Sequence, residues 1–129
     1  MAQIKAVKPT ESELEILQVL WSKGKATVRD VHEVLLTTRD IGYTTTLKLM
    51  QIMFEKGLVT RDASNRTHIY TAACNKEKTQ KQLLGKFISN LFGGSSSQLV
   101  LQTLGTHKIT EKELDDIQHL IDQLKKENT

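Results

Sequence analysis

The hydrophobic positions near the start of the chain recur at helical spacing and predict two amphipathic helices. The first helix is expected to begin after Thr10, which forms a capping box with Glu13, and to end at Gly24. Thr27 is expected to cap the second helix. The apolar positions of the two helices are Leu14, Leu17, Leu20 and Trp21, and then Val28, Val31, Val34 and Leu35. Each set falls on one face, so both helices are predicted to contribute to a core.

A third helix is predicted from residue 43 to residue 56, between Gly42 and Gly57. At about 100° per residue, one arc of this helix is apolar and is expected to face inward. The residues of this arc are Tyr43, Leu47, Met50 and Phe54. The opposite arc is mostly polar and consists of Thr45, Lys48 and Ile52, flanked by Thr44 and Gln51. Such a face can bind base edges and phosphates, but it equally suits an ordinary solvated helix face.

Residues 58–72 predict a β-hairpin directly after this helix. A polar turn at residues 62–66 separates two segments rich in β-branched or aromatic residues. A helix that leads into a hairpin is typical of a winged helix-turn-helix, which places the helix in the DNA major groove and the hairpin near the backbone. The predicted DNA-binding residues are Thr44, Thr45, Lys48, Gln51, Arg61, Arg66 and His68. For His68, pairing with a cross-strand neighbour is the alternative.

Residues 75–129 predict three further helices with wide apolar faces. Residues 93–97 are expected to form a tight bend with serine caps, in preference to a flexible linker, and Thr110 with Glu113 predicts the start of the last helix. The segment contains no sheet to cover its apolar faces, so pairing with a second copy is predicted, with folding back onto the first domain as the alternative. The predicted dimerisation residues are Leu83, Leu84, Phe87, Leu91, Phe92, Leu99, Leu101, Leu114, Ile117, Leu120, Ile121 and Leu124. The tail from Lys125 onward is expected to fray.

The predicted fold is therefore mainly α with a small β-hairpin. Residues 1–74 form a winged-helix DNA-binding domain and residues 75–129 a helical dimerisation domain. The chain has 129 residues and a net charge of +3, which permits nucleic-acid binding without requiring it. Positive residues on the third helix and hairpin, at Lys48, Lys56, Arg61 and Arg66, lie where the motif predicts DNA. A winged helix that binds only other proteins is the alternative function.

Other classes of protein are disfavoured by what the sequence lacks. It has no glycine-rich phosphate loop and no nucleophile motif, and its four histidines lack the short spacing of metal ligands, so we expect no enzyme, cofactor or metal. The single cysteine, Cys74, is predicted to be a small buried residue. No apolar run could span a bilayer, and residues 1–8 lack the apolar core of a signal peptide. A cytoplasmic location is therefore expected.

Several short segments can be compared with known families. They are PTESELEIL at residues 9–17, VLW at 19–21, ATVRDV at 26–31, GYTTTL at 42–47, MFEKGLV at 53–59, LFGGS at 91–95 and LV at 99–100. Together, and in this order, they resemble the BlaI/MecI/CopY family of bacterial transcriptional repressors. The resemblance extends from about residue 9 to residue 124. It implies a repressor that binds palindromic operator DNA as a homodimer, with the winged helix on the DNA and the C-terminal helices forming the dimer.

The resemblance also implies how such a repressor is released. In the β-lactam branch of the family, a membrane sensor with a zinc metallopeptidase domain triggers cleavage of the C-terminal domain. The corresponding segment here, residues 99–104, lacks the Asn-Phe pair found at the scissile bond of the best-known members. The copper branch uses a C-terminal cysteine cluster, and this chain has no cysteine after Cys74. The resemblance therefore implies a metallopeptidase sensor pathway but no copper sensing.

Overall fold

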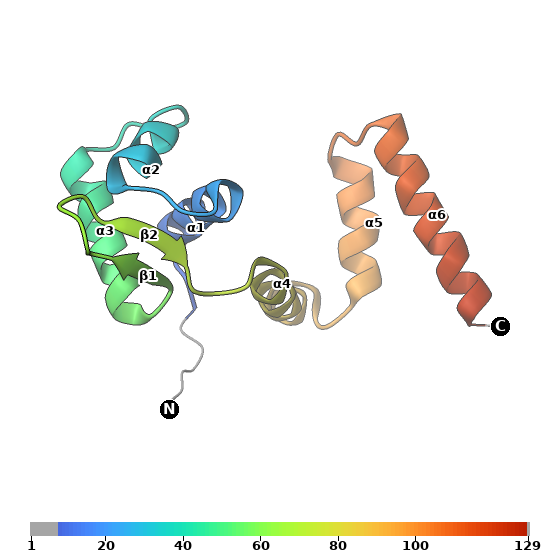
Figure 1. Cartoon of the computed structure of the whole chain (residues 1–129). Coiled ribbons are helices and arrows are strands. Elements are labelled where there is room, and N and C mark those ends of the chain that lie inside the picture. Colours follow the sequence, from blue (N-terminus) through green and yellow to red (C-terminus); the bar gives the residue numbers. More distant parts are fainter. Residues whose placement is uncertain (1–7, 129) are drawn as a thin grey trace. The chain divides into compact units, whose positions relative to one another are not determined.

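The computed structural model describes residues 8–128 and contains six helices and one hairpin within that range (Figure 1). The elements are α1 (Glu11–Lys23), α2 (Val28–Leu35), α3 (Tyr43–Lys56), β1 (Val59–Asp62), β2 (Ile69–Ala72), α4 (Lys76–Phe92), α5 (Ser96–Thr106) and α6 (Glu111–Glu127). The chain divides into two compact units, Met1–Gln80 and Lys81–Thr129, so the division falls within α4. Residues 1–7, which include most of the segment tested for a signal peptide, lie outside the described residues.

Threonine capping boxes begin three of the helices. The sequence predicted the boxes of Thr10 and Thr110, and for Thr27 it predicted a cap alone. Before α1, the Thr10 hydroxyl accepts the Glu13 backbone N–H at 3.2 Å, and the Glu13 carboxylate accepts the Thr10 N–H at 3.0 Å. Thr27 and Thr110 make the same reciprocal pairs with the acids three residues on. Hydrogen bonds from the threonine backbone and side chain lower the pKa of both acids, Asp30 and Glu113. The starts of these helices are therefore set by local sequence.

The core of the first unit is formed by α1, α2, α3 and the hairpin. Its buried members include Ile16, Leu17 and Leu20 of α1, Val31 and Leu35 of α2, Met50 and Met53 of α3, and Val59 and Tyr70 of the hairpin. The two strands pair antiparallel, with Val59 opposite Ala72 and Arg61 opposite Tyr70. Tyr70 also exchanges two backbone hydrogen bonds with Ala26, at 2.8 and 3.0 Å, which join the hairpin to the segment before α2. The hairpin is therefore fastened to the core at both strands.

The predicted inward face of α3 is partly wrong. Met50 is buried as expected, but Tyr43 is 44% exposed and Phe54 is 37% exposed, while Thr46 and Met53 occupy the inward positions. The helix packs against α1, α2 and β1, and neither the tyrosine nor the phenylalanine belongs to the core that these elements form. A threonine can be buried here because its hydroxyl bonds to a histidine of α2.

Two smaller predictions about the first unit also need correction. Val34 was placed on the buried face of α2 but is exposed. Cys74 is half-buried rather than buried, and its Sγ lies 3.9 Å from the Leu58 carbonyl oxygen. The backbone carbonyl of Cys74 accepts a hydrogen bond from Trp21 Nε1 at 3.1 Å, which ties the end of the hairpin to α1.

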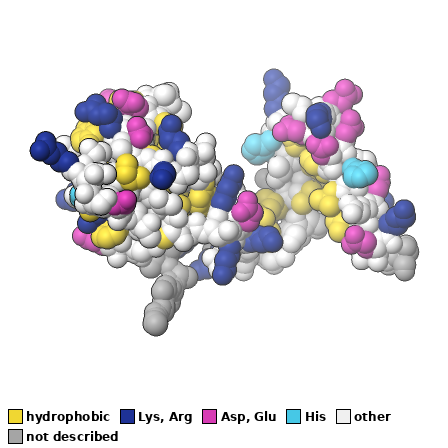
Figure 2. Space-filling view, viewed as in Figure 1, with side chains coloured by type: hydrophobic (Ala, Val, Ile, Leu, Met, Phe, Trp, Pro, Cys, Tyr) yellow, Lys and Arg dark blue, Asp and Glu magenta, His cyan; other side chains and the backbone are white. Residues whose placement is uncertain are grey.

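The second unit has no buried side chain among residues 81–128. Gly93 and Gly94 have positive φ values of 60° and 88°, and Ser95 caps α5 through the Gln98 N–H, so the predicted tight bend is confirmed. Helix α6 continues to Glu127, so the prediction that the tail frays from Lys125 is wrong for 125–127. Hydrophobic side chains gather between α5 and α6 on the face shown in Figure 2. This unit therefore lacks an enclosed core of its own.

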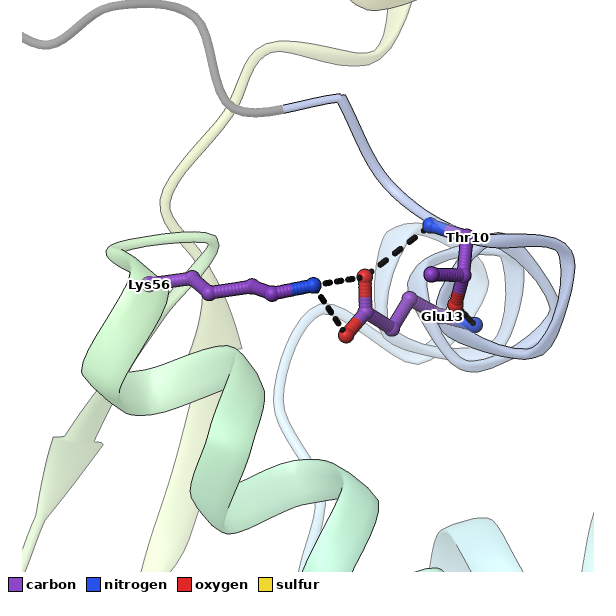
Figure 3. Close-up of polar contacts among 3 residues, drawn as sticks. All are labelled: Thr10, Glu13 and Lys56. Atoms are coloured by element: carbon purple, nitrogen blue, oxygen red, sulfur yellow. Dashed lines mark hydrogen bonds and ion pairs between the residues drawn. The ribbon is translucent and has the colours of Figure 1, made fainter.

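One buried ion pair joins α1 to the end of α3 (Figure 3). The Glu13 side chain is almost fully buried, and Lys56 Nζ donates to its two carboxylate oxygens at 3.0 and 2.8 Å. Burial alone raises the pKa of Glu13, but the hydrogen bonds and charge of Lys56 and the hydrogen bonds of Thr10 outweigh it and hold the pKa below its usual value. The carboxylate is therefore ionised in the folded unit.

We expect Lys56→Met to lower the free energy of unfolding by about 3 kcal/mol at pH 7, because it leaves a buried carboxylate without its cation. A carboxyl with a lowered folded-state pKa stabilises the fold above its unfolded-state pKa, and that stability is lost as the pH falls through the folded-state pKa. The difference between variant and wild type should therefore shrink in acid. Urea unfolding followed by the fluorescence of Trp21, the sole tryptophan, measures this.

Glu13→Gln added to Lys56→Met should recover part of the lost stability, since an amide has no charge to bury. A Lys56→Met variant as stable as wild type at pH 7 would contradict the role of this pair.

Candidate nucleic-acid interface

One side of α3 presents a row of exposed polar side chains. Thr44, Thr45, Lys48 and Gln51 are all exposed, whereas Ile52 is half-buried. The helix begins after Gly42, which makes no side-chain cap, and ends at Gly57, where φ is +84°. The residues predicted to read bases are therefore accessible together on one helix. Their contact with DNA stays a prediction.

The hairpin carries its basic side chains at different levels of exposure. Arg61 is half-buried, with its guanidinium carbon 4.1 Å from the centre of the Phe54 ring. Arg66 is exposed in the turn, and His68 is half-buried. The turn is ordered by Asp62, whose carboxylate accepts the Ser64 N–H at 2.9 Å. Hydrogen bonds from the serine side chain and backbone lower the pKa of this aspartate.

A hollow of about 630 Å³ lies between the start of α2, one side of α3 and the hairpin. It brings together four of the predicted DNA-binding residues, which are Gln51, Arg61, Arg66 and His68. Thr44, Thr45 and Lys48 do not line it. The remaining lining residues are Thr27, Val28, Arg29, Tyr43, Leu47, Thr67 and Tyr70. The predicted residues therefore form an outer row on α3, namely Thr44, Thr45, Lys48 and Gln51, and a group around the hollow, and Gln51 belongs to both.

Arg29 lines the hollow but was not singled out from the sequence. Its guanidinium carbon lies 6.0 Å from the centre of the Tyr43 ring. The sequence placed it one position beyond the apolar Val28 at the start of α2, with nothing local to indicate that α2 begins beside the hairpin. Only the folded arrangement brings this residue near Arg61 and Arg66.

The angle between α2 and α3 is held by a contact that the sequence also did not indicate. His32 Nδ1 lies 2.9 Å from the hydroxyl oxygen of Thr46, which is fully buried. The His32 ring meets the Tyr43 ring edge-on, with 5.4 Å between centroids. This contact orients the first turn of α3, where the outer row begins.

Lys56 does not belong with the DNA-facing charges, contrary to the sequence-based expectation. Its ammonium group forms an ion pair with the buried Glu13 carboxylate of α1, which neutralises its charge. Within residues 8–128, no three His, Cys, Asp or Glu side chains lie together as a metal site would require. No helix of the same residues combines the length and apolarity needed to cross a bilayer.

The three-helix core, the exposed face of α3 and the hairpin beside it define a winged helix-turn-helix protein. A family model described as penicillinase repressor matches residues 9–123, so the chain belongs to that family of transcriptional repressors. The methicillin resistance regulatory protein MecI of Mammaliicoccus sciuri is 19% identical over 119 residues, which cover 92% of this chain and 97% of that protein. The transcriptional regulator BlaI of Mycobacterium tuberculosis is 30% identical over 90 residues, which cover 69% and 65%.

Solved structures agree on the fold. The DNA-binding domain of the repressor BlaI matches with a TM-score of 0.51 at 20% identity, over 57% of this chain and 90% of that one. A mutant MarR from E. coli, complexed with operator DNA, matches with a TM-score of 0.50 at 15% identity, over 89% and 74%. The named relatives are regulators rather than enzymes.

We expect His32→Ala to lower the free energy of unfolding by about 1–3 kcal/mol, because it leaves the buried Thr46 hydroxyl without its partner. Glu33→Ala, on the exposed side of the same helix, is the control and should change stability by less than about 0.5 kcal/mol. Urea unfolding followed by Trp21 fluorescence compares the two. If adding Thr46→Val to His32→Ala restores no stability, the hydroxyl is not the cause.

Proposed function

We propose that this repressor is a homodimer that binds a palindromic operator, with α3 of each protomer in the major groove and each hairpin against the adjoining backbone. The observation that carries the proposal is the outer row of α3, Thr44, Thr45, Lys48 and Gln51, exposed beside an arginine-bearing hairpin. An α-helix fits the major groove, where each base pair presents a distinct pattern of donors and acceptors. Family membership supports the same assignment.

The side chains of the outer row suit different base edges. Lys48 can donate to the acceptors of guanine, and the Gln51 amide can pair with adenine as donor and acceptor at once. Thr44 and Thr45 offer a hydroxyl for polar edges and a methyl group for the thymine methyl. Arg61, Arg66 and His68 of the hairpin would contact backbone phosphates, which adds affinity but carries no sequence information.

Dimerisation is proposed from the uncovered apolar surface of the second unit. Seven of the predicted dimerisation residues are exposed, namely Leu84, Phe87, Leu91, Leu101, Leu114, Leu120 and Leu124. The others, Leu83, Phe92, Leu99, Ile117 and Ile121, are half-buried. So many exposed large apolar side chains in fewer than fifty residues favour burial against an identical surface. A twofold dimer also presents two recognition helices to successive turns of DNA.

We further propose that cleavage within residues 99–104 would release the operator, as the metallopeptidase pathway of the β-lactam branch implies. This segment lies inside α5, so cleavage requires local unfolding of that helix. A cut there would separate the apolar residues of α4 from those of α6, which include Leu114, Leu120 and Leu124. The dimer surface would lose part of its area without any change to α3.

The first experiment is fluorescence anisotropy on DNA from upstream of the protein's own gene, with scrambled DNA of the same length and a salt series. Tight, sequence-selective binding that weakens linearly in log salt supports the proposal. Equal and weak binding to both DNAs, repeated on a genome-wide set of fragments, would favour a winged helix that binds only other proteins.

Lys48→Ala and Arg66→Ala should weaken DNA binding in different ways. Lys48→Ala should lower operator affinity roughly tenfold and scrambled-DNA affinity less, because it removes a base contact. Arg66→Ala should weaken binding to both DNAs alike and lower the salt dependence by about one counterion, because it removes a phosphate contact. Anisotropy titrations give both quantities, and wild-type binding by both variants would refute these assignments.

Leu101→Asp should convert the dimer into monomers, because it places a charge in an apolar contact surface. Leu101 is 66% exposed, and Leu36 of the first unit, 48% exposed, provides the matched control Leu36→Asp, which should stay dimeric. Analytical ultracentrifugation distinguishes a dimer of the 14.6 kDa chain from a monomer. A wild-type protein that sediments as a monomer while bound tightly to operator DNA would contradict the proposed assembly.

A further inference from the structure

The hollow beside α3 is strongly basic. Its lining includes Arg29, Arg61, Arg66 and His68, and no aspartate or glutamate is among its lining residues. Three arginines around one concave surface create a positive potential that attracts anions, and low-dielectric walls strengthen it. The hydroxyls of Thr27 and Thr67 add neutral donors at the same surface.

Two other cations of the same unit are paired with carboxylates, unlike these three arginines. Arg39 Nη1 lies 2.7 Å from a carboxylate oxygen of Glu15, and Lys56 is bonded to Glu13. Within residues 8–128, no carboxylate lies within ion-pair distance of the arginines at the hollow. Asp62 interacts electrostatically with His68, so the unpaired positive charge of the hollow is that of its three arginines.

Aromatic rings hold two of the arginines in place. Arg29 lies over Tyr43, and Arg61 lies over Phe54 at a distance of 4.1 Å. Both rings belong to α3 and are more than one-third exposed, although a phenylalanine is usually buried. A ring face attracts a guanidinium group but leaves its N–H donors available to a further anion. Tyr43 itself lines the hollow, whereas Phe54 does not line it and contacts it only through Arg61.

The position of the hollow indicates which anion it would bind in a complex with DNA. If α3 enters the major groove and the hairpin reaches the adjoining groove, one sugar-phosphate strand must pass between them. The hollow lies between α3 and the hairpin, and Gln51 belongs both to its lining and to the outer row.

We propose that the hollow is a binding site for the phosphodiester backbone of one operator strand, and that Arg29 is one of its phosphate ligands. This inference rests on the proposed function. It adds a residue of α2 to the interface, so that the helix before the recognition helix also fixes the register of the protein on DNA. It assigns Tyr43 and Phe54 the role of positioning residues for Arg29 and Arg61.

Arg29→Ala tests the inference, with Arg39→Ala as the control of equal charge change. Removing one phosphate contact should lower affinity for operator and scrambled DNA alike, by about tenfold at 0.1 M salt, and should lower the salt dependence by about one counterion. Arg39→Ala should leave both quantities near their wild-type values, since this arginine is paired with Glu15 and does not line the hollow.

A second measurement locates the contact on the DNA. Operators that carry one neutral methylphosphonate each, placed in turn along one strand, are titrated with wild-type protein and with Arg29→Ala. At the phosphate bound by Arg29, the methylphosphonate should lower the affinity of wild-type protein about tenfold. It should hardly change the affinity of Arg29→Ala, because that variant already lacks the same contact. Elsewhere the two proteins should respond alike.

Three results would overturn the inference and leave the proposed function standing, provided that wild-type protein binds the operator selectively. One is an Arg29→Ala variant that binds like Arg39→Ala. Another is equal sensitivity of wild type and variant to every methylphosphonate. The third is displacement of the operator from wild-type protein, but not from Arg29→Ala, by inorganic phosphate at constant ionic strength, which would make the hollow a site for a small free anion. Unselective binding by the wild type instead refutes the proposed function itself.

Discussion

The buried carboxylate of Glu13 is the constraint on which the interface depends. A charge in this position is tolerated only if it is paired and hydrogen-bonded, and Lys56 at the last position of α3 supplies the charge. Gly57 follows at once, and the Leu58 N–H bonds back to the Met53 carbonyl at 2.9 Å before β1 begins. The pair that fixes the end of α3 therefore also fixes the start of the hairpin, so the two elements proposed to face DNA share one anchor on α1.

The other end of α3 is held by His32, and the two anchors leave the helix with three distinct sides. Thr46, Met50 and Met53 face the core, and Tyr43 lines the hollow. Leu47 lines the hollow and also packs against the core. The outer row is exposed, and its member Gln51 also lines the hollow. A recognition helix needs this division, because a side chain engaged in the core cannot reach a base edge. In the proposed complex, the contacts that orient the helix would therefore act on DNA recognition without touching DNA.

The sequence predicted the elements of this fold well and their mutual orientation less well. Capping boxes, the glycine after α3 and the serine cap of α5 involve residues only a few positions apart, so they can be read locally. The side of α3 that faces the core depends on where α2 and the hairpin lie, and a count at helical spacing placed Phe54 there and omitted Met53. For the same reason Lys56 was assigned to the DNA side and Arg29 to no role. Both assignments depend on partners far along the chain, Glu13 for the lysine and the hairpin arginines for Arg29.

The two units differ in how they can be regulated. The winged unit has its own core, whereas residues 81–128 contain no buried side chain. In the proposed homodimer, the second α3 binds at the high effective concentration that the first creates, which adds about 10²- to 10⁴-fold to operator affinity. Loss of the dimer would remove that gain in affinity, although the outer row of each α3 would stay unchanged. Control of such a repressor therefore needs no conformational change at α3, and any signal that weakens the apolar contacts of the second unit is sufficient.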